Sequence, residues 1–159
     1  AEGIFNPQYP FGAKLNKKRI GAIPIGQSLN YNNINLILYN LLGVPYKWGG
    51  KTSLGFDCSG LVQSVLNVYG IKIPRDSKNQ WRFLEPYKIN IDKAKKGDLH
   101  FFGKKGKVSH VGFACGGYDF IHSQGCVKKE SLDQNDPNFN KSLLDIYLSS
   151  VSIRLKFKL

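Results

Sequence analysis

The stretch Gly55-Phe56-Asp57-Cys58-Ser59-Gly60-Leu61-Val62 decides how the chain is organised, because it places a cysteine where a helix begins. Apolar residues follow Cys58 at helical spacing, namely Leu61, Val62, Val65, Leu66 and Tyr69. The pattern predicts a helix from Cys58 to about Tyr69, which Gly70 ends. Unpaired backbone amides and the positive end of the helix dipole lie in the first helical turn, and both favour a thiolate over a thiol.

Two histidines lie far downstream in short apolar runs that are typical of β-strands. His110 lies in Val108-Ser109-His110-Val111-Gly112-Phe113 and His122 in Phe120-Ile121-His122-Ser123. Gly116-Gly117, between the runs, predicts a tight two-residue hairpin turn. Such a hairpin makes His110 and His122 cross-strand neighbours on one face of the sheet. One cysteine with distant histidines is typical of a cysteine nucleophile that an imidazole base activates.

Turn residues divide the rest of the chain into a helical half and a strand-rich half. Residues 1–30 are rich in Gly, Pro, Asn and Lys, and we expect an N-terminal arm, irregular or with short strands, ahead of one domain over 31–159. Helices are predicted at 32–42, 58–69 and from Ser77 through Trp81. Strands are predicted at 99–102, 108–115, 118–123 and 126–130, followed by a short helix near 141–148 and a closing strand at 151–157. Helices first and antiparallel strands after them indicate an α+β fold.

The charge of the chain is strongly basic. It has 159 residues, with 23 Lys and Arg against 11 Asp and Glu, and a net charge of +12. Such a balance favours anionic surroundings such as nucleic acid, an anionic membrane or an anionic cell-wall polymer. No helix-turn-helix, zinc-finger or aromatic RNA-binding motif accompanies the lysines, so we expect no nucleic-acid partner. No run approaches the roughly 18 apolar residues that a transmembrane segment needs.

The cysteine count excludes two common frameworks. Three cysteines give no disulfide framework, and without a CxxC pair a thiolate zinc site is not expected. Cys115 and Cys126 are either a pair or two free thiols. The three histidines with Asp57 and Asp98 leave a metal site as an alternative, which the context of Cys58 disfavours.

Several of these residues also have an ordinary structural interpretation. Taken alone, Cys58 is an inert buried thiol, and each histidine is a core residue with satisfied ring nitrogens. Asp57 suits a helix N-terminus for its charge, and serines such as Ser59 and Ser77 are common at helix starts. His100 belongs to no motif and is assigned a structural role.

Six motifs, in order, resemble the NlpC/P60 (p60-like) family of papain-like cysteine peptidases that act on bacterial cell-wall peptides. They are Pro45-Tyr46-Lys47-Trp48-Gly49-Gly50, Phe56-Asp57-Cys58-Ser59-Gly60-Leu61-Val62, Pro74-Arg75-Asp76-Ser77, Lys96-Gly97-Asp98-Leu99, Ser109-His110-Val111-Gly112 and Ile121-His122-Ser123. The resemblance covers roughly residues 30 to 156. It implies a papain-like fold, with a helical half packed on an antiparallel β-sheet and the active site between them.

The resemblance also implies roles for individual residues. Cys58 matches the nucleophile, His110 the general base, which would hold Cys58 as a thiolate, and His122 the polar residue that orients this base. Tyr46 matches a tyrosine at the active-site rim, and its hydroxyl would join the backbone amide of Cys58 in stabilising an oxyanion. Three further residues match those that hold the free amino end of L-Ala-γ-D-Glu, namely Asp57, Ser59 and Ser77. No metal and no cofactor are implied.

The Gly55-Phe56-Asp57 and Arg75-Asp76-Ser77 stretches point to the γ-D-glutamyl-L-diamino acid endopeptidase subgroup. Its members cut peptidoglycan stem peptides between γ-D-Glu and meso-diaminopimelate or Lys. Two features depart from the subgroup: residues 1–30 are too short for the usual SH3 domain, and His100 replaces an apolar residue.

The resemblance also bears on where the protein acts and on which other functions stay open. It implies a secreted, periplasmic or cell-wall-associated protein, and a start at Ala1 without a signal-peptide pattern fits either a mature secreted form or a trimmed chain. The net charge adds anionic cell-wall polymers as partners. Two other functions stay open, an acyltransferase or amidase of the same fold and a non-catalytic basic wall-binding module.

Overall fold

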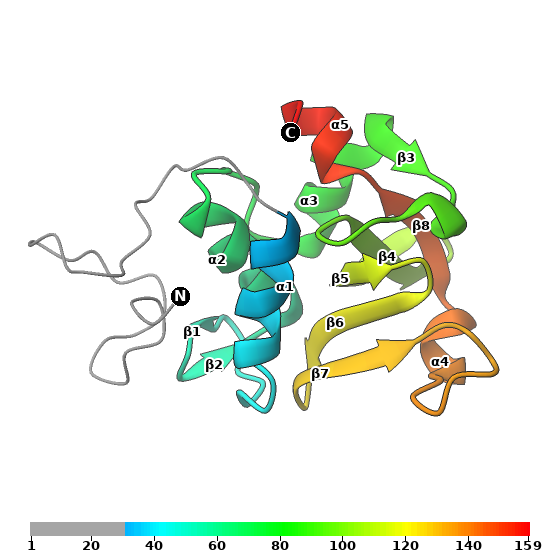
Figure 1. Cartoon of the computed structure of the whole chain (residues 1–159), viewed down its shortest axis with the longest axis horizontal. Coiled ribbons are helices and arrows are strands. Elements are labelled where there is room, and N and C mark those ends of the chain that lie inside the picture. The colour runs from blue at the N-terminus through cyan, green and yellow to red at the C-terminus, as the bar shows by residue number, and fades with distance from the viewer. Residues whose placement is uncertain (1–30) are drawn as a thin grey trace, which may run out of the picture.

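Helices α1 (Tyr31–Asn40) and α2 (Cys58–Val68) lie on one side of an antiparallel sheet in the computed structural model, which describes residues 31–159, and the short helix α4 (Lys141–Leu144) lies on the other (Figure 1). The arm expected over residues 1–30 lies outside the described residues. Three helices form the helical layer: α1 (Tyr31–Asn40), α2 (Cys58–Val68) and α3 (Ser77–Leu84). Helices α2 and α3 both pack against the central strand β5 (Lys107–Gly116). The described residues therefore have the α+β class that the sequence predicts.

Six strands form the main sheet, and every neighbouring pair is antiparallel, in the order β3-β8-β4-β5-β6-β7. In addition to β5, the sheet contains β3 (Lys88–Ile89), β4 (Leu99–Lys104), β6 (Asp119–Gln124), β7 (Cys126–Ser131) and β8 (Tyr147–Val151). A separate two-stranded hairpin of β1 (Lys51–Thr52) and β2 (Gly55–Phe56) leads into α2. The short helices are η2 (Glu85–Tyr87), η3 (Ile91–Lys93), α4 (Lys141–Leu144) and α5 (Ile153–Phe157).

The larger of two apolar clusters lies between α1, α2 and the sheet, and the smaller contains Phe102, Phe120, Leu132 and Leu143. The apolar stripe that predicts α2 is its buried face, with Leu61, Val62, Val65 and Leu66 fully buried. The inward side chains of β5 and β6, such as Val111, Phe113 and Ile121, belong to the same apolar cluster. Burying each such side chain contributes roughly 1.5–3 kcal/mol, so this interface fixes the start of α2 against β5.

The C-terminal prediction is wrong in its order of elements. Residues 147–151, predicted partly as helix, form β8, and residues 153–157, predicted as strand, form α5. The cause is local capping, since the Ser152 side chain accepts a hydrogen bond from the Leu155 amide at 3.3 Å and starts a helix there. The buried carboxylate of Asp98 holds this helix by accepting from the Ile153 amide at 3.1 Å and pairing with Arg154.

Cys115 and Cys126 are two free thiols. Cys115 lies on β5 and Cys126 on β7, with β6 between those strands. Strands two places apart in a sheet are separated by about 9–10 Å, which is beyond the reach of a disulfide.

Candidate active site

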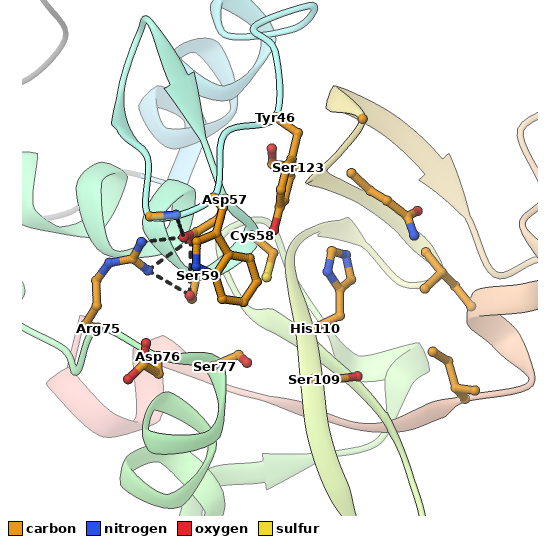
Figure 2. A pocket seen from close by; sticks show the side chains of 16 residues that line it. Tyr46, Asp57, Cys58, Ser59, Arg75, Asp76, Ser77, Ser109, His110 and Ser123 are labelled. Atoms are coloured by element: carbon orange, nitrogen blue, oxygen red, sulfur yellow. Dashed lines mark hydrogen bonds and ion pairs between the residues drawn. The ribbon is translucent and has the colours of Figure 1, made fainter.

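Cys58 is the first residue of α2 and lines a cavity of about 660 Å³ between the helices and the sheet (Figure 2). Asp57 is the N-cap of this helix, and its carboxylate accepts a hydrogen bond from the Gly60 amide at 2.6 Å. Gly60 lets the preceding loop come close, because a Cβ there would lie 2.1 Å from the carbonyl oxygen of Gly50. Capping and this close approach fix the backbone of Cys58 at the cavity wall.

His110 lies across the cavity from Cys58, on β5, and its ring faces the cysteine side chain (Figure 2). Its Nε2 lies 2.7 Å from Nδ1 of His122 on β6, and the two rings are nearly perpendicular at 84°. The contact between these imidazoles that the sequence predicts is therefore present. Since Nε2 of His110 is occupied by His122, only Nδ1 of His110 remains to meet the Cys58 thiol.

The predicted cross-strand register of the two histidines is wrong, although both lie on one face. Phe113 pairs with Ile121, and a bulge lies between Ala114 and Gly116. Continuing that register places Gly112, not His110, opposite His122, so the imidazoles meet diagonally. A Cβ on Gly112 would lie 2.9 Å from Cβ of His122, and glycine at this position leaves room for the diagonal contact.

A carboxylate that was not predicted from the sequence completes this row of side chains. Oε2 of Glu130, on β7, lies 2.9 Å from Nε2 of His122. The same oxygen accepts a hydrogen bond from Asn140 at 2.7 Å, and Lys128 lies 2.8 Å from Oε1. Burial opposes ionisation, but hydrogen bonds from His122, Lys128 and Asn140 outweigh it and lower the pKa of Glu130 to about 2.

The ionisation of the cysteine and histidine differs from the expected thiolate–imidazolium pair. Burial, followed by the charge of Asp57, raises the pKa of Cys58, and the backbone amides of Ser59 and Val111 only partly offset this. Burial, followed by the charge of His122, lowers the pKa of His110 to about 3. Both directions favour a neutral thiol facing a neutral imidazole in the resting site.

Asp57 carries a dense set of hydrogen bonds on the other side of Cys58. Besides Gly60, it accepts from the Gly49 amide at 2.9 Å and from the Ser59 hydroxyl at 3.3 Å. Arg75 binds both carboxylate oxygens, with Nη1 at 2.9 Å from Oδ1. Although burial raises it, the pKa of Asp57 is lowered overall, chiefly by the Arg75 hydrogen bonds. Arg75 belongs to the motif Pro74-Arg75-Asp76-Ser77, and the sequence predicts neither a role for it nor its pairing with Asp57.

The other predicted site residues also line the cavity. Tyr46 is held by its amide, which donates to the Gly125 carbonyl at 2.8 Å, and its hydroxyl points toward Cys58 (Figure 2). Burial and the nearby Cys58 raise the pKa of Tyr46, so the hydroxyl keeps its proton as a donor. Ser59 and Ser77 lie on the Arg75 side of the cavity, where Ser59 Oγ accepts from Arg75 at 3.0 Å.

The metal alternative has no support among residues 31–159, where no three His, Cys, Asp or Glu side chains are grouped to hold an ion. Asp98 binds the Ile153 amide and Arg154 of α5. Both ring nitrogens of His100 have protein partners, the Ser150 hydroxyl at 2.8 Å and the Gly117 carbonyl oxygen at 3.0 Å. The same part of the chain contains no helix of the length and hydropathy that crossing a membrane requires.

Comparison with known proteins gives consistent similarities. The NlpC/P60 family profile matches residues 43–146. A γ-D-glutamyl-L-lysine dipeptidyl-peptidase of Bacillus subtilis is 42% identical over 146 residues, which are 89% of this chain and 48% of that protein. The chain thus spans about half the length of this relative, and it spans 30% of the enzyme of the same name from Bacillus cereus, to which it is 38% identical over 62% of its own residues.

Solved structures give the same result for the fold. An NlpC/P60 family protein from Bacillus cereus superposes with a TM-score of 0.68 at 30% identity, covering 80% of this chain and 41% of that chain. The NlpC/p60 domain of the peptidoglycan hydrolase SagA superposes with a TM-score of 0.64 at 34% identity, covering 79% of this chain and all of that domain.

Proposed function

The chain belongs to the NlpC/P60 family, and from this premise we propose that it is a cysteine endopeptidase of peptidoglycan stem peptides, with residues 31–159 as the catalytic domain. One observation carries the proposal. Cys58 stands at the capped start of α2, facing a histidine whose far nitrogen is held at 2.7 Å by a second histidine. This arrangement joins a nucleophile, a base and a group that orients the base within one cavity.

The proposed reaction begins with proton transfer from the Cys58 thiol to Nδ1 of His110 as the sulfur attacks the substrate carbonyl. The backbone amide of Cys58 and the Tyr46 hydroxyl stabilise the oxyanion, and removing one such donor typically costs about 100-fold or more in rate. His110 then protonates the leaving amine, which leaves an acyl group on sulfur as a thioester. Water, deprotonated by His110, hydrolyses the thioester and restores the thiol.

The same geometry orients the substrate in the cavity. Because His110 protonates the leaving amine, the leaving residue lies on the His110 side. Leu143 and Ile146 line the cavity and pack with Phe102, whose ring contacts His110, so they form the wall on this side. The acyl part then lies on the side of Asp57 and Ser77. The Asp and Arg residues among the described lining residues are Asp57, Arg75 and Asp76, which lie together on the other side of Cys58 (Figure 2), so the wall of Leu143 and Ile146 favours the aliphatic part of a diamino acid.

We propose the bond between γ-D-Glu and a diamino acid, Lys or meso-diaminopimelate, as the bond that is cut. The support is the name of the Bacillus subtilis relative, a γ-D-glutamyl-L-lysine peptidase, and the peptidoglycan hydrolase among the structural relatives. Asp57, Ser59 and Ser77 are proposed to line the subsite for the amino end of the L-Ala residue, where the Asp57 carboxylate is occupied by Arg75 in the resting site. A substrate in the cell wall places the enzyme outside the cytoplasm, and the net charge of +12 favours retention on anionic wall polymers.

The test is mass spectrometry of the products from defined muropeptides that contain Lys or meso-diaminopimelate. The expected products are L-Ala-γ-D-Glu and a peptide that begins with the diamino acid. Cys58→Ala is expected to fall below about a thousandth of the wild-type rate, because covalent catalysis does not survive loss of the nucleophile. Cys115→Ala, which removes a free thiol on β5 away from the cavity, is the matched control and keeps full activity.

Three outcomes contradict the proposal. Cleavage at another bond removes the assigned specificity, and transfer of the acyl group to an added amine in place of water makes the protein an acyltransferase. Retention on sacculi without turnover, unaffected by alkylation of Cys58, makes it a wall-binding module.

A further inference from the structure

The row of side chains behind Cys58 does not end at the second histidine. His122 is fully buried, and its outer nitrogen lies 2.9 Å from the Glu130 carboxylate. We propose that Glu130 is a positioning residue that selects the ring protonation of His122 and, through it, of His110. The inference rests on the proposed roles of Cys58 and His110. Glu130 lies outside all six sequence motifs that resemble the family.

The selection follows from counting donors and acceptors along the row. Ionised Glu130 only accepts hydrogen bonds, so Nε2 of neutral His122 carries the proton and donates it to Oε2. The Nδ1 atom of His122 is then a lone pair, which accepts from Nε2–H of His110 across 2.7 Å. The proton of neutral His110 is thereby fixed on Nε2, and its Nδ1 presents a lone pair to the Cys58 thiol. A base for this thiol requires that tautomer.

The partners of Glu130 hold the carboxylate ionised and in place. Lys128 binds Oε1 at 2.8 Å, while Asn140 donates to Oε2 at 2.7 Å. An ion pair on one oxygen and an amide on the other hold the carboxylate with Oε2 at 2.9 Å from His122. When His110 takes a proton from Cys58, the resulting cation has a fixed negative charge at the far end of the row.

Asn140 connects Glu130 to α4, the helix that carries the cavity residue Leu143. Its Oδ1 caps α4 by accepting from the Leu143 amide at 2.9 Å, while its Nδ2 donates to Glu130. Leu143 lines the leaving-group side of the cavity. One asparagine therefore ties the group that orients the histidines to the wall that receives the leaving residue.

The experiment compares Glu130→Ala and Glu130→Gln with Asp119→Asn. Asp119 pairs with Lys129 at 2.7 Å on the same two strands without contact to either catalytic ring, which makes it the matched control. Each protein is assayed for kcat and KM on the muropeptide that the wild type cleaves. The side-chain ¹⁵N spectra of His110 and His122 report which ring nitrogen carries the proton, independently of any substrate.

Glu130→Ala is expected to lower kcat by roughly 10- to 150-fold, the range for loss of a charge-assisted hydrogen bond, with KM within about twofold. Its His122 and His110 spectra are expected to show mixed tautomers. Glu130→Gln keeps an oxygen that accepts from His122, so the wild-type tautomers persist and kcat falls by less than about tenfold through loss of the charge. Asp119→Asn changes neither readout.

Unchanged kcat together with unchanged ¹⁵N spectra in Glu130→Ala overturns the inference. If that variant does not fold, Glu130→Gln decides alone, and changed ¹⁵N spectra of His122 and His110 in this variant, which keeps an acceptor oxygen for His122, overturn the inference. If the wild type cleaves no muropeptide, the proposed function fails, whereas the tautomers of wild type and variants still test the role of Glu130.

Discussion

The substitution Arg75→Gln is expected to increase the preference for substrates with a free amino end. In this protein both oxygens of the Asp57 carboxylate bind Arg75, and backbone amides and the Ser59 hydroxyl also donate to them. A carboxylate offers about four lone-pair sites, so Asp57 has no site left for a substrate ammonium group while Arg75 stays in place.

The expected magnitudes follow from this occupancy. With Arg75 present, the attraction for an ammonium group comes from the exposed carboxylate of Asp76, which gives its own helix no capping hydrogen bond. A surface charge pair contributes about 0–1 kcal/mol, so the wild-type preference is at most roughly fivefold. Arg75→Gln releases Asp57, and a charge-assisted hydrogen bond of about 1.5–3 kcal/mol then gives a preference of roughly 10- to 150-fold.

The assay compares kcat/KM for L-Ala-γ-D-Glu-diamino acid peptide with kcat/KM for its N-acetylated form. Arg82→Gln is the matched control, since Arg82 is an arginine of α3 that has no contact with Asp57. The Arg75 side chain is only 29% exposed, and its loss is expected to lower the free energy of unfolding by about 1–3 kcal/mol. All rates are therefore measured well below the midpoint of thermal unfolding.

Two results refute this reasoning. A wild-type preference well above tenfold means that Asp57 binds the ammonium group although Arg75 occupies it. A ratio that is unchanged or lower in Arg75→Gln means that Arg75 contributes to binding the amino end rather than competing for Asp57.

Other predictions concern the histidine row and its surroundings. The rate of Cys58 alkylation is expected to keep rising above pH 8, since burial raises the thiol pKa; a plateau from pH 5 to 8 would instead reveal a pre-formed ion pair. His122→Gln keeps an acceptor for His110 and retains more activity than His122→Ala, and equal loss in both contradicts an orienting role. Gly112→Ala places a Cβ 2.9 Å from that of His122, which is expected to cost about 1–3 kcal/mol of stability as well as activity; wild-type values for both exclude the steric account. The pKa of Glu130 is lowered from 4.5 to about 2, so its contribution to stability is complete above pH 4.5 and is lost as pH falls toward 2, and parallel unfolding curves for wild type and Glu130→Gln over that window contradict it.

The helix that carries Cys58 could be predicted because its signals are local. An acidic N-cap, a cysteine and an apolar stripe at helical spacing lie within a dozen residues, and α2 begins at Cys58 as predicted. The meeting of His110 and His122 was also predictable, since a hairpin joins their strands. Their diagonal register was not, because it depends on a bulge near the turn that no residue pattern announces.

The partners of the predicted residues required three-dimensional information. Arg75 reaches Asp57 across 18 positions of sequence, from a segment whose path is set by packing. Glu130 lay in a predicted strand as one charge among several, and only the pairing of His122 with Lys128 brings its carboxylate to the far ring nitrogen. Arg75 and Glu130 contact the predicted site residues through tertiary packing and strand register, and neither composition nor periodicity predicts such contacts.

Two ion-pair networks lie on opposite sides of Cys58, and they act on different charges. One joins His110 and His122 to Glu130, and the other joins Asp57 to Arg75. Burial keeps His110 and His122 neutral at rest, and a net charge of +12 further disfavours a cation between them. The proposed proton transfer from Cys58 nevertheless creates such a cation, and Glu130 is the carboxylate placed to stabilise it, with Lys128 paired to its other oxygen. On the other side, the charge of Asp57 opposes formation of the Cys58 thiolate, and the positive charge of Arg75, which pairs with Asp57, partly offsets this effect. Glu130 and Arg75 therefore favour the charge-separated state of the proposed attack, while Cys58 and His110 are neutral at rest, and this links the proposed reaction to residues that never touch the substrate carbonyl.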